Sequence, residues 1–156
     1  MSVVITLVQG AAILLCSLVL GTVFGIWRGY DPATYAPATF VEVHQGAVRG
    51  LNVLIPALGG ITVIAIVALA VVGRDRPAVL WLYGLAFVAM VIGGLVTRFG
   101  NQPINDIVMG WSADTLPPEW ASIRDRWWTF HLYRLVSSAA AELLLIAAIF
   151  TQRGSP

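Results

Sequence analysis

Two histidines, one arginine and two asparagines are the side chains best suited to chemistry in this chain. His44 and His131 are the only histidines, and Arg134 follows His131 by three residues. Asn101 and Asn105 are four residues apart and would share one face of a helix. A neutral imidazole can act as a general base, and a guanidinium with carboxamides can stabilise an oxyanion or enolate. We therefore predict His131 as a base, with His44 as alternate, and an anion held by Arg134, Asn101 and Asn105; the asparagines could instead order the loop.

Aromatic residues surround these polar groups in the sequence. Trp111, Trp127 and Tyr133 lie close to the histidine and arginine positions of the C-terminal half. Flat aromatic side chains can line the entrance for a flat, lipophilic substrate, and they also anchor helices at the membrane interface. Substrate contact by these three residues is the prediction, with anchoring as the alternative.

Metal or haem ligation is a second chemistry open to the histidines. His44 and His131 with a carboxylate such as Glu42 could hold iron or copper, and helical bundles can hold haem between two histidines. The chain has no HxH or HxxxH spacing, and Cys16 is its only cysteine, so a thiolate cluster is excluded. We expect no cofactor and keep iron, copper or haem as alternatives.

The elements that must position these residues are membrane-spanning helices. Hydrophobic residues make up 58% of the 156 residues and charged residues 11%, against about 25% charged in soluble domains. Apolar blocks of the length that crosses a bilayer, roughly 20 residues, predict an all-α bundle of four transmembrane helices in a single integral membrane domain covering 1–156. The predicted spans are 3–26, 48–72, 79–96 and 130–150.

The connections predict which residues meet. Gly73 to Pro77 forms a tight turn, whereas the segments 27–47 and 98–129 are long, aromatic and charged. With four spans, the two long connections lie on one side, where the second of them forms an ordered polar cap. His44 and His131 then lie near the same membrane face. We expect both termini to be cytoplasmic, in a bacterial inner membrane.

The fourth span carries a polar face. Ser138 and Glu142 fall within about 20° of His131 around a helix. Ionisable groups at this depth usually face the protein interior and are paired. Asn52 or Gln9 are the expected partners of Glu142. A purely structural role for this face is the alternative.

Small residues and one proline predict details of the packing. Glycines four residues apart favour close helix approach in lipid, and Pro56 should kink the second span. The glycine pairs are Gly21 with Gly25 and Gly46 with Gly50.

Charge excludes some partners. The net charge is +1, every basic residue is arginine, and no basic patch is present. Nucleic acid is therefore not expected as a partner. The expected partners are the lipid bilayer and a lipophilic small molecule, and a homo-oligomer stays open.

The third connection and fourth span resemble the anthrone oxygenase-like family, also known as the DUF1772 integral membrane proteins. The residues that carry the resemblance are Asn101, Pro103, Asn105, Trp111, Pro117, Trp120, Arg124, Arg126, Trp127, His131 and Arg134. The four-span layout with a short central turn extends it over nearly the whole chain. The resemblance implies oxidation of anthrones to anthraquinones with dioxygen, without a classical cofactor. It also implies that Asn101, Asn105, His131 and Arg134 are the polar signature.

The sequence leaves three classes of function. The first is a small membrane oxygenase, an anthrone oxygenase-like monooxygenase acting on a phenolic or anthrone-like molecule. The second is a non-catalytic membrane binding or assembly protein, in which the polar residues only join helices. The third is a redox protein with a histidine-ligated metal or haem. An apolar cavity beside the histidines and Arg134 would favour the first class.

Overall fold

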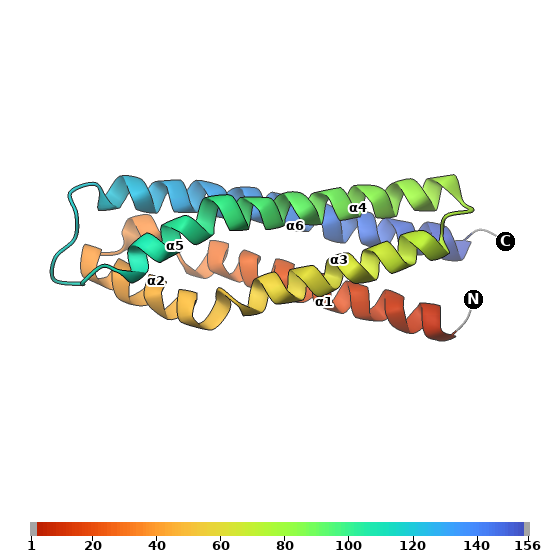
Figure 1. Ribbon diagram of the computed structural model, residues 1–156, viewed down its shortest axis with the longest axis horizontal. Coiled ribbons are helices and arrows are strands. Elements are labelled where there is room, and N and C mark those ends of the chain that lie inside the picture. Colours follow the sequence, from red (N-terminus) through yellow and green to blue (C-terminus); the bar gives the residue numbers. More distant parts are fainter. Residues whose placement is uncertain (1–2, 155–156) are drawn as a thin grey trace.

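Four long helical rods run side by side in the computed structural model, which describes residues 3–154 (Figure 1). Each rod is long and apolar enough to cross a membrane. Within the described residues there is no β-strand, so the predicted all-α, four-helix fold is confirmed. In chain order the elements are α1 (Val3–Gly29), the 3-10 helix η1 (Pro32–Thr34), α2 (Pro37–Leu51), α3 (Leu54–Val72), α4 (Pro77–Val96), the π-helical turn η2 (Thr97–Asn101), α5 (Gln102–Met109) and α6 (Trp120–Gly154).

The two ends of the bundle carry different connections. The tight turn between α3 and α4 lies at the same end as the first and last described residues, on the right of Figure 1. Helix η1 and the connection 110–119 lie at the opposite end. The predicted grouping of the two long connections on one side is therefore confirmed. The cytoplasmic location of the termini and the bacterial inner membrane stay predictions.

The helices extend well beyond the predicted spans. The third rod continues through η2 and α5 to Met109, and the fourth begins at Trp120 instead of residue 130. Most of the predicted third connection is thus helical, and only 110–119 links the two rods. At about 1.5 Å per residue, the 35 residues of α6 exceed a hydrocarbon core of about 30 Å. Helix α6 is therefore long enough for at least one of its ends to extend beyond the hydrocarbon core.

The second rod is broken between α2 and α3, at Asn52 and Val53. Pro56 has no N–H group and cannot bond to the carbonyl of Asn52, one helical turn earlier. The predicted kink is confirmed, and Figure 1 shows the bend where the two helices meet. The bend separates α2 from the line of α3 and leaves room between the rods at this depth.

The closest helix contact lies between the third and fourth rods. A Cβ atom added at Gly93 would lie 2.8 Å from the Ser137 hydroxyl oxygen, and one at Gly100 would lie 2.7 Å from the ring of Phe130. The glycine pairs of the first and second spans behave differently, because an added Cβ meets nothing within 4 Å there. The prediction of close packing is wrong for Gly21, Gly25, Gly46 and Gly50.

Two hydrophobic clusters fill the bundle. Aliphatic residues dominate the half nearer the termini, where Cys16, Ile66, Tyr83 and Leu145 are fully or almost fully buried. The other half has an aromatic cluster that includes Tyr30, Phe40 and Trp127. The aromatic cluster surrounds the polar residues from which the sequence predicted chemistry.

Candidate functional site

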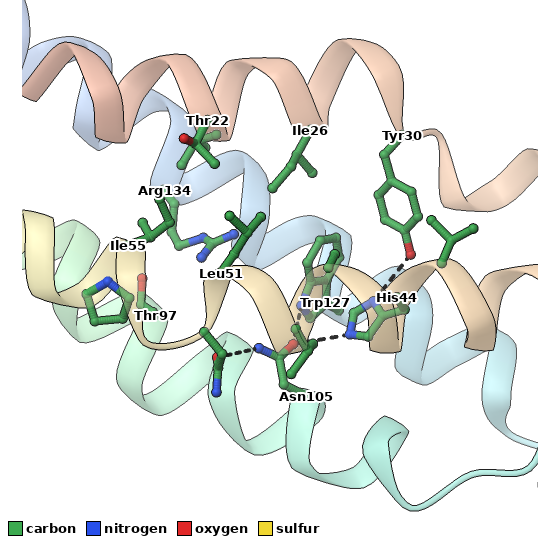
Figure 2. Close-up of a pocket in the computed structure, with 16 residues that line it drawn as sticks. Thr22, Ile26, Tyr30, His44, Leu51, Ile55, Thr97, Asn105, Trp127 and Arg134 are labelled. Atoms are coloured by element: carbon green, nitrogen blue, oxygen red, sulfur yellow. Dashed lines mark hydrogen bonds between the residues drawn. The ribbon is translucent and has the colours of Figure 1, made fainter.

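A cavity of about 150 Å³ lies between α1 and the broken second rod, with residues of η2, α5 and α6 behind it (Figure 2). We call it the Arg134 cavity. A dry cavity of about this volume can hold a single aromatic ring. Its walls are mostly apolar, which suits a lipophilic ligand. Its polar lining residues are Thr22, Tyr30, His44, Asn52, Thr97, Asn105, Trp127 and Arg134.

Asn105 is the centre of the polar network on one wall. Its side-chain oxygen accepts a hydrogen bond from the indole nitrogen of Trp127 at 2.8 Å, and it lies 3.2 Å from Nε2 of His44. Its amide nitrogen donates to the Asn52 side-chain oxygen at 2.9 Å. An indole nitrogen can only donate, so the Asn105 atom facing it must be the oxygen. Nε2 of His44 must therefore carry hydrogen and donate as well.

This assignment fixes the tautomer of His44. With hydrogen on Nε2, Nδ1 of the neutral ring is an acceptor. The hydroxyl of Tyr30 lies 3.2 Å from Nδ1 and donates to it. Tyr30 and His44 both line the Arg134 cavity (Figure 2). The Tyr30 hydroxyl, which donates to the unprotonated Nδ1 of His44, therefore faces the cavity.

His131 has both ring nitrogens engaged. Nη2 of Arg134 donates to Nδ1 of His131 at 2.8 Å, because a guanidinium can only donate. Nε2 of His131 then carries hydrogen and donates to the backbone carbonyl of Val23 at 3.1 Å. The ring is fully buried and does not line the Arg134 cavity. This geometry favours His131 as the residue that positions Arg134, and its predicted role as a base stays a prediction.

Arg134 brings a positive charge to the cavity without a carboxylate partner. No salt bridge within residues 3–154 involves it, and its Nε atom is buried without a hydrogen-bond partner. Glu142 instead accepts a hydrogen bond from Ser17 at 2.7 Å. The expectation that Asn52 or Gln9 would bind Glu142 is wrong, because both bond to other amide side chains. A partly buried guanidinium that lacks a counter-ion favours an anionic ligand.

The Trp127 ring contacts the rings of both histidines. Its ring lies 4.8 Å from the His44 ring between centroids, and it stacks on the His131 ring at 5.3 Å. Asn101, in the π-helical turn, donates to the backbone carbonyl of Trp127 at 3.0 Å. Asn101 does not line the cavity, although its side-chain oxygen is buried without a partner. Asn101 and Asn105 thus hold Trp127 from its backbone and from its ring, and only Asn105 faces the cavity.

Two aromatic residues predicted at the substrate lie elsewhere. Trp111 packs against Phe40, and its backbone carbonyl accepts a hydrogen bond from Gln45. Tyr133 is 57% exposed and contacts Phe130 on the outer face of α6. Neither residue lines the Arg134 cavity. Their outward or peripheral placement is typical of interfacial packing.

The alternative metal set of His44, His131 and Glu42 is not brought together. Glu42 is exposed, on the side of α2 away from His44. No group of three histidine, cysteine or acidic residues in the part of the chain that the structure describes could hold a metal ion. Trp127 also lies between the two imidazole rings. The residues present do not fit a metal or haem shared by the histidines.

Four polar residues of the cavity were not predicted from the sequence to lie at the site, namely Thr22, Tyr30, Asn52 and Thr97. One local feature of the sequence pointed to Asn52, because the kink at Pro56 leaves the backbone carbonyls of the preceding turn without a helical partner. Tyr30 reaches His44 only because η1 turns the chain back before α2. Thr97 lies where the π-helical turn starts, and nothing in the local sequence marks that turn.

Comparison with protein families identifies the chain. The family model described as anthrone oxygenase matches residues 45–144. The matched segment contains Asn105, His131 and Arg134, whereas Tyr30 and His44 lie before it. No curated protein and no solved structure matches the chain. Since the match covers well over half of the residues, the chain belongs to the anthrone oxygenase family.

Proposed function

We propose that this protein is a membrane oxygenase that oxidises a flat, lipophilic phenolic or anthrone-like molecule with dioxygen in the Arg134 cavity. The observation that carries the proposal is the guanidinium of Arg134, which faces an apolar cavity with no acidic partner and with its Nε unbonded. Such a group stabilises an oxyanion as it forms. Membership of the anthrone oxygenase family supports the same class of reaction.

The reaction balances as one dioxygen consumed for each CH₂ group converted to a ketone and one water. The base removes a proton from the activated carbon, and the resulting enolate oxygen lies against Arg134. The electron-rich carbon reduces dioxygen and forms a C–O bond, and the peroxide takes up the proton. Loss of the second C–H proton with cleavage of the O–O bond releases water and leaves the ketone. Arg134 contributes by stabilising the enolate oxygen.

The proposed base is His44 acting together with Tyr30. The Tyr30 hydroxyl donates to Nδ1 of His44 and lines the cavity. It can take the substrate proton while passing its own proton to Nδ1, which leaves an imidazolium hydrogen-bonded to Asn105. His131 serves in this proposal as the positioning residue of Arg134, since both of its nitrogens are engaged.

The proposed reaction uses no metal or haem. An electron-rich enolate can give electrons to dioxygen itself, and the hydrogen bonds of His44 and His131 occupy all four ring nitrogens. Metal analysis and visible absorbance of the detergent-purified protein check this point. Stoichiometric iron or copper, or a haem absorption band, would contradict it.

A non-catalytic binding or assembly role is the alternative that the cavity disfavours. Polar residues that only join helices satisfy one another and need no hollow between them. Here the buried Nε of Arg134 stays unbonded and its side chain lines a cavity. A binding protein could share the cavity, so only turnover separates the two functions.

The test is oxidation of anthrone by the protein in lipid nanodiscs, with oxygen uptake and quinone formation measured together. We expect equal amounts of oxygen consumed and quinone formed. His44→Gln should lower kcat by about 10²–10⁴, the contribution of a general base. His131→Gln should keep measurable turnover, because a glutamine oxygen can still accept from Arg134.

Two outcomes would contradict the proposal. Absence of turnover above that of empty nanodiscs would remove the enzymatic function. A wild-type rate in His44→Gln together with loss of turnover in His131→Gln would instead return the role of base to His131. Far-UV circular dichroism of each variant shows whether the helical fold is retained.

A further inference from the structure

A second hollow of about 440 Å³ lies next to the Arg134 cavity, and we call it the side cavity. It lies between α3 and α4, with Val19 of α1 at its inner wall. Gly60, Gly94 and Leu95 line it and are exposed on the outer surface of rods that span the membrane. Lipid therefore has direct contact with the side cavity.

The two cavities share one wall. Ile55, Pro56 and Thr97 line both of them. In Figure 2, Ile55 and Thr97 lie at the end of the Arg134 cavity where Arg134 is, away from Tyr30 and His44. A molecule that passes this wall would therefore arrive beside the Arg134 guanidinium, which has no carboxylate partner within residues 3–154. Pro56 lies in the first turn of α3, directly after the break in the second rod, and it cannot donate a backbone hydrogen bond.

Glycines keep the side cavity open. A Cβ atom added at Gly60 or Gly94 would meet nothing within 4 Å, and one added at Gly59 would meet only the tip of Met90 at 3.9 Å. These glycines are therefore not required for close helix packing. Their missing side chains leave more space between α3 and α4 instead.

The end of the side cavity nearer the long connections is polar. Arg98 and Gln102 line it there, and the other lining side chains are apolar apart from Thr97. Within residues 3–154 the Arg98 side chain has no hydrogen bond or salt bridge. The combination suits a molecule with an apolar body and an oxygen-bearing edge, held with its edge toward the interface.

We propose that the side cavity is the antechamber through which the lipophilic reactant leaves the bilayer and reaches the Arg134 cavity. This proposal rests on the proposed function for the identity of the reactant. The molecule enters between α3 and α4, orients its oxygen-bearing edge with Arg98 and Gln102, and passes when Ile55 and Thr97 rotate aside. No covalent step is involved.

The test measures how fast anthrone binds, without oxygen, so that it does not depend on turnover. Anthrone in nanodiscs is mixed with the protein anaerobically. The part of the tryptophan quenching that is lost in Trp127→Phe reports its arrival beside Trp127, a wall of the Arg134 cavity. Gly94→Leu and Gly60→Leu fill the side cavity from its two opposite helices. Each should slow association by about tenfold or more while the equilibrium dissociation constant changes little, as expected when only the path is obstructed.

Gly84→Leu is the matched control. Gly84 lies on the same helix as Gly94, has no neighbour within 4 Å of an added Cβ, and lines a different hollow that does not include residues of the Arg134 cavity. The control should bind anthrone at the wild-type rate. The two leucine substitutions lie on different helices, so if one variant misfolds, the other still tests the proposed path.

The outcomes separate this inference from the proposed function. Slow binding in both Gly60→Leu and Gly94→Leu, with no oxidation by the wild-type protein, would support the antechamber and contradict the proposed oxygenase function. Normal oxidation with wild-type association rates in both fillers would overturn the antechamber and leave the oxygenase intact. Equal slowing in Gly84→Leu, or no quenching in the wild-type protein, would also overturn the antechamber.

Discussion

The two ends of the bundle solve the same problem, polar side chains inside a membrane protein, in different ways. At the end with the termini, Gln152 accepts hydrogen bonds from Gln9 at 3.0 Å and from Tyr83 at 2.8 Å. Arg153 donates to Gln9 through two nitrogens. At the other end the network around Asn105 is equally dense, but the buried Nε of Arg134 has no partner.

The two ends differ in the surroundings of their arginine side chains. Arg153 is exposed at a helix end, where water and lipid headgroups can solvate it. Arg134 lies farther into the bundle, faces an apolar cavity and bonds to a neutral histidine instead of a carboxylate. A network in which every polar group is hydrogen-bonded stabilises the fold. A guanidinium without a counter-ion can instead bind an anion. We therefore infer that the termini end is structural and the other end is functional.

Exchange of each arginine tests this contrast with the largest expected effect. Arg134→Gln should lower kcat for anthrone oxidation by about 10²–10³, as for loss of an oxyanion-stabilising donor. Arg153→Gln should leave kcat unchanged, because Arg153 lies at the opposite end from the cavity. Steady-state quinone formation in nanodiscs measures both. Equal losses in the two variants would mean that the ends do not differ in function.

Removal of the central amide from each network compares their contributions to stability. Asn105→Leu deprives His44, Trp127 and Asn52 of their partner. Since each buried group left unpaired costs about 1–3 kcal/mol, the free energy of unfolding should fall by about 3 kcal/mol or more. Gln152→Leu removes the acceptor of Gln9 and Tyr83 and should cause a somewhat smaller loss.

Denaturation in mixed detergent micelles measures both stability losses, and oxygen uptake separates the two variants. The Asn105 variant should also lose activity, since the hydrogen bond that sets the tautomer of His44 disappears. The Gln152 variant should keep its activity under conditions in which it is folded. Full activity in folded Asn105→Leu would show that the tautomer of His44 does not matter.

Two glycines of the third rod give the smallest and most local comparison. Gly100→Ala places a Cβ atom 2.7 Å from the Phe130 ring, whereas Gly94→Ala places one in open space. Overpacking of this kind costs about 1–3 kcal/mol, so Gly100→Ala should lower thermal stability and Gly94→Ala should not. Equal melting temperatures for the two variants would show that the contact between η2 and α6 has room for an added methyl group.

The fold was predictable because apolar blocks of bilayer length leave few alternatives. The four spans, the grouping of the connections at the two ends of the bundle, and the kink at Pro56 all followed from composition and local chemistry. Helix ends were harder to predict, since residues 97–109 and 120–129 are polar or aromatic yet helical. These segments are stabilised by packing within the aromatic cluster, and local hydropathy does not report that packing.

The candidate site was predictable only in outline. Helical periodicity placed His131 on the buried face of α6, and topology placed His44 at the same end of the bundle. The division of roles needed the structure, because the engagement of both His131 nitrogens depends on Val23, more than one hundred positions away. Glycine spacing failed as a guide at Gly21 and Gly46, because the helices approach closely at Gly93 and Gly100 instead.

The most direct test of the account is an experimental structure of the protein with anthrone, prepared without oxygen in nanodiscs. We expect density for the oxygen-bearing ring of anthrone in the Arg134 cavity, with its oxygen within hydrogen-bonding distance of Arg134 and its reactive carbon facing Tyr30. Density for anthrone beside Gln9 and Gln152, with the Arg134 cavity empty or filled by a protein side chain, would contradict the assignment of the functional end.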